Sequence, residues 1–187
     1  MKNKKEKKEK KKKVIPLPKL RNKLLKLWSE ACREKENFTC VMCGIKRGEV
    51  DPLDPERIGK IDCHHALQKY IKDCPLKFDI RNSVVVCAKH HKFCGTNSFH
   101  KAPIVAYEWF RVNYPEKHAF ILANKDLKVD LDNRFVLEEI ERKLLAKEPL
   151  DLDKLKQIEK EFPREIKEKK PKIEEKSPDD PSNIANI

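Results

Sequence analysis

Two short Cys/His pairs have the residue types and the spacing of zinc ligands. Cys40 and Cys43 form a C-x2-C pair, and Cys87 is followed by His90 at the same offset. Tetrahedral zinc takes four nitrogen or sulfur ligands at about 2.0–2.3 Å, and such ligands commonly come from closely spaced pairs on turns. The sequence therefore predicts a structural zinc site formed by these four residues.

Other cysteines leave two alternatives open. The main competitor for a place in this site is Cys94, and three more distant cysteines could also contribute, namely Cys32, Cys63 and Cys74. The cysteines could instead be ordinary buried residues, although two pairs with matching spacing argue against this. Because a closed four-ligand site is structural rather than catalytic, the metal would replace part of a core too small to hold the fold alone.

A second set of polar residues is interleaved with these pairs. His64 and His65 are adjacent in a predicted strand, where neighbouring side chains point to opposite faces. Asn82 begins the next predicted strand, and His91 directly follows His90. If His90 binds zinc, His91 remains beside it on the first turn of a predicted helix. A His–Asn–His set then extends over a strand, a loop, a second strand and a helix.

This layout resembles that of the HNH endonucleases, which carry it on a ββα-metal fold. The resemblance rests on "CVMC" at 40–43, "DCHHAL" at 62–67, "FDIRNSVVVCAKHH" at 78–91 and their mutual spacing, and it covers about residues 20–115. The stretches "LKFDIRN" and "AYEWFRVNYPE" look most like phage-type members, including the NinG-like recombination nucleases.

The resemblance implies a metal-dependent DNA endonuclease. Such an enzyme hydrolyses phosphodiester bonds to 5′-phosphate and 3′-hydroxyl ends, by nicking, double-strand cutting or resolution of branched DNA. By position, His65 matches the general base and Asn82 matches the residue that orients it. His64 and His91 match the ligands of a catalytic Mg²⁺ or Mn²⁺ ion. An unperturbed imidazole pKa of about 6.5 suits a base that works near neutral pH.

The third ligand of the catalytic ion departs from the family pattern. Many members carry it one helical turn beyond the second ligand, where this chain has Gly95. Asn97 or His100 could substitute, although neither has the expected spacing, and Asp62 is a further candidate. For His100 and His118 we favour the interpretation that they are surface histidines or histidines satisfied by neighbours.

Hydrophobic periodicity predicts the elements that must position these residues. Helices are expected over 19–34, 102–115, 116–123, 133–147 and 151–162, and strands over 60–67 and 82–88. Residues 51–59 and 68–81 are expected to be loops, and residues 89–100 to begin as a helix that ends near Gly95. Because His64 and His65 must both reach one phosphate, we expect a β-bulge or an irregular strand end near residues 63–65.

Together these elements predict a small α+β protein with structural zinc knuckles, flanking helices and disordered termini, and the resemblance implies that its core is a ββα-metal fold. The expected organisation is a disordered basic arm (1–18), a nuclease domain with an N-terminal helix (19–115), a helical C-terminal extension (116–162) and a disordered tail (163–187). The C-terminal helices could form a dimer, but the sequence leaves the oligomeric state open.

The positive charge is concentrated at the N-terminus. Residues 1–26 contain thirteen Lys or Arg against two Glu, in a chain with a net charge of +12. The sequence has no apolar run near the ~20 residues of a spanning helix and no secretory signal. We therefore expect a cytoplasmic protein, which the resemblance places in a prokaryotic or phage-infected cell. There the seven cysteines would be metal ligands or free thiols rather than disulfides.

The resemblance makes DNA the expected partner, whereas charge alone does not separate a nucleic acid from an anionic membrane or a nuclear import signal. Basic side chains near the predicted cleft are candidates to neutralise flanking phosphates, and these are Lys69, Lys72, Lys77, Arg81, Lys89 and Lys92. The alternative function, from a different class, is a zinc-stabilised DNA-binding accessory protein that does not cut. The two differ at His65, whose replacement should abolish cutting without loss of zinc or DNA affinity only in the nuclease.

Deletion of residues 1–13 tests whether the basic arm attracts DNA. If it does, the truncated chain should bind DNA more weakly and with a shallower dependence on salt, because fewer counterions are released on binding. Affinity measured at low and high salt gives both values. Unchanged affinity at both would instead assign the arm to solubility.

Overall fold

The computed structural model describes residues 14–51, 54–66 and 72–164. Its α-helices are α1 (Leu17–Lys35), α2 (Pro103–Asn113), α3 (Pro115–Asn124), α4 (Arg134–Leu145) and α5 (Leu152–Glu161). Its strands are β1 (Val50–Asp51), β2 (Asp54–Ile58), β3 (Ile61–His65) and β4 (Ser83–Cys87). Two 3₁₀ turns, η1 (Pro75–Phe78) and η2 (Ile80–Asn82), precede β4, and a π-helical turn, η3 (Lys89–Phe93), follows it.

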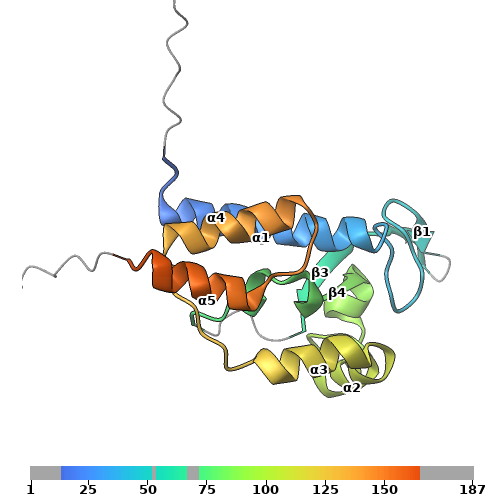
Figure 1. Cartoon of the computed structure of the whole chain (residues 1–187). Coiled ribbons are helices and arrows are strands. Elements are labelled where there is room, and N and C mark those ends of the chain that lie inside the picture. The colour runs from blue at the N-terminus through green and yellow to red at the C-terminus, as the bar shows by residue number, and fades with distance from the viewer. Residues whose placement is uncertain (1–13, 52–53, 67–71, 165–187) are drawn as a thin grey trace, which may run out of the picture.

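The β3–β4 hairpin lies between two pairs of helices. Figure 1 shows α1 beside α4 on one side of the hairpin and α2 with α3 on the other. Helix α5 packs against α4. Among the described residues, no helix has both the length and the apolar character needed to cross a membrane.

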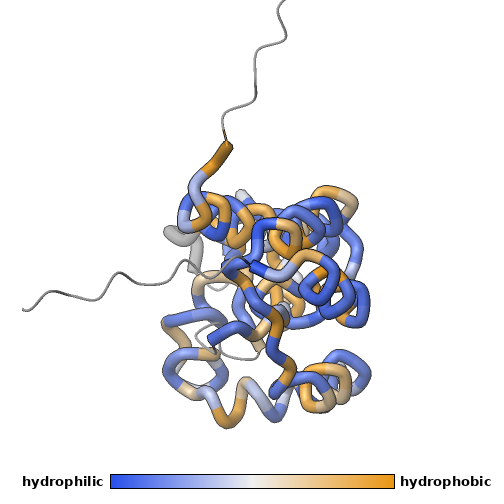
Figure 2. Tube along the Cα trace, turned by 60° about the vertical axis from the view of Figure 1, so that its left-hand side comes forward, coloured by the Kyte–Doolittle hydropathy of each residue, from blue (hydrophilic) through white to orange (hydrophobic). Residues whose placement is uncertain are grey.

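Amphipathic helices enclose a single hydrophobic core. Hydrophilic and hydrophobic residues alternate along the helices (Figure 2), as expected for helices that bury one face. Leu24 and Trp28 of α1 belong to the same buried cluster as Val85 of β4, Leu137 of α4 and Leu155 of α5. The predicted C-terminal extension therefore shares its core with the predicted nuclease domain.

The expected helices and the two central strands are confirmed, but two expected loops contain regular structure. In the first, residues 51–59, β1 and β2 form an antiparallel hairpin. Backbone bonds close it, since the Gly59 amide donates to the Glu49 carbonyl and the Gly48 amide donates to the Gly59 carbonyl. A side chain at Gly59 would lie 2.3 Å from the Lys46 carbonyl oxygen, so this close approach requires glycine. In the second expected loop, residues 68–81, the described residues include the 3₁₀ turns η1 and η2.

The β-bulge expected near residues 63–65 is absent. β3 and β4 pair in a continuous antiparallel register, from Ile61 opposite Cys87 to His65 opposite Ser83. His64 and His65 therefore point to opposite faces of an ordinary strand.

A buried carboxylate fixes the segment before β4. Asp79 is fully buried and accepts hydrogen bonds from the Arg81 amide (2.8 Å) and from Arg81 Nε (3.0 Å) and Nη2 (2.7 Å). Arg81 Nη2 also donates to the Leu150 carbonyl (2.7 Å), and the guanidinium lies 3.5 Å from the ring centroid of Phe120. The Trp28 indole donates to the Asp79 carbonyl (2.9 Å). These contacts give Arg81 a structural role, and its predicted contact with a phosphate stays a prediction.

Asp79→Ala should lower the free energy of unfolding by roughly 3 kcal/mol, because it leaves a partly buried guanidinium without its partner. Urea unfolding of the full chain measures the change. Asp153→Ala, an exposed carboxylate in the first turn of α5, is the control and should change stability by at most a few tenths of a kcal/mol. Equal losses for the two variants would contradict the structural role of Asp79.

Candidate metal centres

A tight turn after α1 presents the first cysteine pair. Cys40 and Cys43 lie on a turn closed by a bond from the Gly44 amide to the Cys40 carbonyl (2.8 Å). Gly44 has a φ of 76°, a left-handed conformation that glycine adopts without strain. The Val41 amide donates to the Val85 carbonyl (3.0 Å), which attaches the turn to β4. The sequence thus places both thiols beside the end of that strand.

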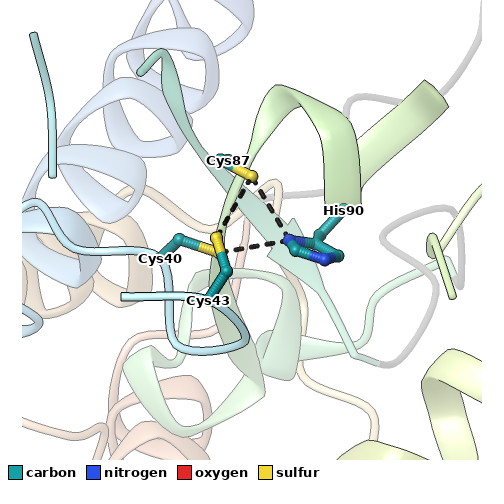
Figure 3. A group of neighbouring side chains, drawn as sticks. All are labelled: Cys40, Cys43, Cys87 and His90. Atoms are coloured by element: carbon teal, nitrogen blue, oxygen red, sulfur yellow. Dashed lines mark hydrogen bonds between the residues drawn. The ribbon is translucent and has the colours of Figure 1, made fainter. Parts of the chain in front are cut away.

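The second pair lies at the end of β4 and in η3, facing the first (Figure 3). Cys43 Sγ is 3.9 Å from Cys87 Sγ, and His90 Nδ1 is 3.6 Å from Cys40 Sγ and 3.3 Å from Cys87 Sγ. A tetrahedral zinc ion would hold two sulfurs about 3.8 Å apart and a sulfur and a nitrogen about 3.5 Å apart. The four predicted ligands are therefore brought together, in a cluster that could hold a structural metal such as zinc.

The competing cysteines lie outside this cluster. Cys94 Sγ contacts Thr96 Oγ1 (3.2 Å), and Cys74 Sγ contacts the Lys125 carbonyl (3.9 Å). Cys32 and Cys63 interact with each other. All seven cysteines fall within the described ranges and none forms a disulfide, as the sequence predicts.

Among the three thiols of this cluster, Cys87 is the one that favours the negatively charged thiolate form. A hydrogen bond from Cys40, together with His90, lowers the pKa of Cys87 to about 3. The same shared bond, and then burial, raises the pKa of Cys40, while burial raises the pKa of Cys43. A divalent cation would favour deprotonation of these two remaining thiols, because coordination requires thiolates.

Cys87→Ser should remove tightly bound metal from the purified chain and lower its unfolding temperature, since metal binding at a closed site adds to folding free energy. Elemental analysis after dialysis, paired with thermal unfolding, gives both results. Cys74→Ser provides the matched control, because Cys74 is also buried but lies outside the cluster; it should retain the metal. A wild-type chain that folds fully without metal would contradict the structural role.

A second cluster contains three histidines. Ligand atoms of His64, His91 and His100 all lie within 4.8 Å of one another. Nε2 of His91 is 3.2 Å from Nε2 of His100, close to the ~3.3 Å separation of two nitrogens on one tetrahedral ion. The ring centroid of His64 is 5.3 Å from each of the other two rings. Three side chains could therefore share one metal ion.

His100 is exposed, as expected of a surface histidine, and it also joins this cluster as one of the two substitutes named for the third ligand. The segment after η3 folds back because the Phe99 amide donates to the His90 carbonyl (3.0 Å) and the His100 amide donates to the His91 carbonyl (3.2 Å). Phe99 is buried and its ring lies 4.6 Å from that of His64. The return of the chain supplies the third histidine that the spacing at Gly95 lacks.

Asp62 orients His91 rather than joining the cluster. Nδ1 of His91 donates to Asp62 Oδ2 at 3.0 Å, because a carboxylate can only accept. Nε2 of the neutral ring then carries the lone pair and faces His100. Burial lowers the pKa of His91, which favours this neutral form. Asp62 and His64 share one face of β3, an alternation visible in the sequence.

His65 lies on the opposite face of β3 and is held by two neighbours. Its ring stacks on Trp28 of α1 with the centroids 3.7 Å apart. Its Nε2 lies 2.9 Å from the Lys77 carbonyl oxygen and must donate to it. The buried Asn82 donates from Nδ2 to the neighbouring Leu76 carbonyl (3.1 Å). Asn82 thereby fixes the η1 turn that holds His65.

Both adjacent histidines border one cavity of about 920 Å³. His64 and His65 line it from opposite faces of β3, and His91 and His100 line it as well. The cavity includes Ala66, just past the last paired residue of the strand. It therefore reaches both faces around the end of β3, and the expected bulge is not needed.

The predicted DNA-binding lysines are scattered. Lys92 lines the cavity, whereas Lys89 borders a different, smaller hollow. Lys77 is half-buried, its Nζ is 5.4 Å from the Phe78 ring centroid and burial lowers its pKa. Lys72 is exposed, and Lys69 lies outside the described residues.

Comparisons of the chain with protein-family models, with curated proteins and with solved structures found no match. The functional assignment therefore rests on the two clusters and on the cavity that borders the second. The Cys/His group is closed because it has four ligands, whereas the histidine group has three and is open. Closed groups are typical of structural metal sites and open groups of catalytic ones.

Proposed function

We propose that this chain is a metal-dependent DNA endonuclease with an HNH-type site and a structural zinc. The observation that carries the proposal is the convergence of His64, His65, His91 and His100 on one cavity. The β3–β4 hairpin and η3 correspond in order to the two strands and the helix of a ββα-metal core. The closed Cys/His cluster at the end of β4 would hold zinc and fix η3 in place.

The open cluster is suited to a hydrolytic ion. Three imidazole nitrogens, from His64, His91 and His100, would leave coordination positions for water and a phosphate oxygen. When bound, the ion would stabilise charge on the phosphate and on the leaving 3′ oxygen. Imidazole donors suit Zn²⁺ well and Mg²⁺ poorly, because Mg²⁺ demands near-ideal octahedral geometry and gives up its waters reluctantly. Of the two ions expected from the sequence, Mn²⁺ is therefore favoured.

In this proposal, His65 accepts a proton from the attacking water. Because Nε2 donates to the Lys77 carbonyl, the lone pair of the neutral ring resides on Nδ1. Proton uptake gives an imidazolium, which the same carbonyl and the stacked face of Trp28 stabilise. Asn82 acts through η1 as a positioning residue. General base catalysis of this kind is typically worth about 10²- to 10⁴-fold in rate.

A cleavage panel tests the proposal. The full chain is incubated with supercoiled, linear and four-way-junction DNA, with added Mn²⁺ or Mg²⁺ and without added divalent metal. We expect cleavage that depends on the metal and is stronger with Mn²⁺. His65→Ala should reduce the rate roughly 10²- to 10⁴-fold while keeping zinc and DNA affinity.

Asp153→Ala is the control, since Asp153 is exposed on α5 and lies outside both metal clusters and the cavity, and it should cut at nearly the wild-type rate. A wild-type chain that binds DNA but cuts none of the substrates with either metal would contradict the proposal. That result would favour the zinc-stabilised DNA-binding accessory protein instead.

A further inference from the structure

The cavity has an apolar wall in addition to its histidines. The start of α2 contributes Pro103, Ile104, Tyr107 and Glu108 to its lining. Ile104 is 85% exposed and Tyr107 is 38% exposed. Exposed apolar side chains that line a cavity indicate contact with a ligand more strongly than scattered ones on an open surface do. A phosphate bound at the histidines would leave this wall uncovered.

Tyr107 packs against two other rings. Its ring centroid is 5.4 Å from that of His118 of α3 and 6.3 Å from that of Phe110. Phe110 is fully buried, so one of the rings that contact Tyr107 is part of the hydrophobic core. The ring therefore forms a firm surface, and a flat partner could stack there at little further cost in side-chain entropy.

The two walls differ in electrostatic character. The histidine wall includes the cationic Lys92. On the α2 wall, Glu108 is paired with Arg111, whose Nε donates to Oε2 at 2.9 Å, so this wall offers no uncompensated positive charge to a phosphate. A ligand that matches both walls carries a phosphate at one end and a neutral aromatic group at the other. A nucleotide has this composition, and the volume of about 920 Å³ lies in the range of small-ligand pockets.

We propose that Tyr107 and Ile104 form a stacking platform for an unpaired nucleobase beside the scissile phosphate. This inference rests on the proposed nuclease function, which places the phosphate at the histidines. Base–aromatic stacking tolerates any base sequence, because every base has a π-face. A base in continuous duplex must first leave its own stack, which costs free energy. The substrate class is therefore DNA with unpaired nucleotides, such as a loop, flap, gap or junction.

A binding assay without cleavage tests the platform. A fluorescent 2-aminopurine is placed in a short unpaired loop of a duplex, and the fully paired duplex of the same sequence is the comparison. Both are titrated with the full chain without added divalent metal. We expect tighter binding to the looped DNA and quenching of the 2-aminopurine as it stacks on Tyr107.

Variants on α2 separate stacking from general electrostatic binding. Tyr107→Ala should weaken binding to looped DNA at least about fivefold, the lower end of base–aromatic stacking, and leave binding to paired DNA unchanged. Tyr107→Phe should retain the preference, because it keeps the ring. Val112→Ala is the control on the same helix, since Val112 is 63% exposed and does not line the cavity. Equal binding of the two DNAs by the wild-type chain, or equal losses on both with Tyr107→Ala, would overturn the platform.

Ile104→Glu gives a second probe that is independent of the Tyr107 packing. Because Ile104 is 85% exposed, the fold should tolerate the change, while the new charge should reduce the preference for looped DNA. An unchanged preference would argue against the platform. The assay requires no turnover, so stacking without cleavage would refute only the nuclease proposal, and cleavage without a loop preference would refute only the platform.

Discussion

The closed Cys/His cluster is the constraint on which the rest of the site depends. It joins the turn that carries Cys40 and Cys43 to the end of β4, a separation of forty-four residues between Cys43 and Cys87. Because His90 and His91 are adjacent in η3, the contact that places one imidazole in this cluster also sets where the other can point. A metal here would fix the short π-turn, which has too few backbone bonds of its own to be rigid. The structural and the open cluster are therefore one mechanical unit.

Strand β3 divides the chemistry between its two faces. Asp62 and His64 face η3, where Asp62 orients His91, whereas His65 faces α1 and stacks on Trp28. The two roles need different surroundings. A proton acceptor must be stabilised as a cation, whereas a metal ligand must keep its lone pair fixed toward the ion. Adjacent positions of a strand supply both surroundings, and the cavity at the strand's end reunites the two side chains.

Sequence reasoning found what is encoded locally. The short spacing of the Cys/His pairs placed the closed cluster, and hydrophobic periodicity placed the helices, because both depend on neighbours a few residues apart. His100 could be named only as one possible substitute for the third ligand, because its position results from backbone bonds made by a return of the chain to η3. The structural role of Arg81 was not foreseen, because only the fold reveals that Asp79 is fully buried beside it. The β1–β2 hairpin was missed because backbone bonds, and not a hydrophobic pattern, close it.

Histidine-ring nitrogen NMR of the full chain, titrated with Zn²⁺, tests the central claim most directly. The geometry requires His90 to bind through Nδ1, which faces Cys40 and Cys87. It requires the adjacent His91 to bind through Nε2 while Nδ1 stays protonated against Asp62. We predict that the two rings show opposite metallated nitrogens, with His90 saturating first. If neither imidazole bound metal in excess zinc, and each still took up a proton as the pH fell, the result would contradict the paired metal centres.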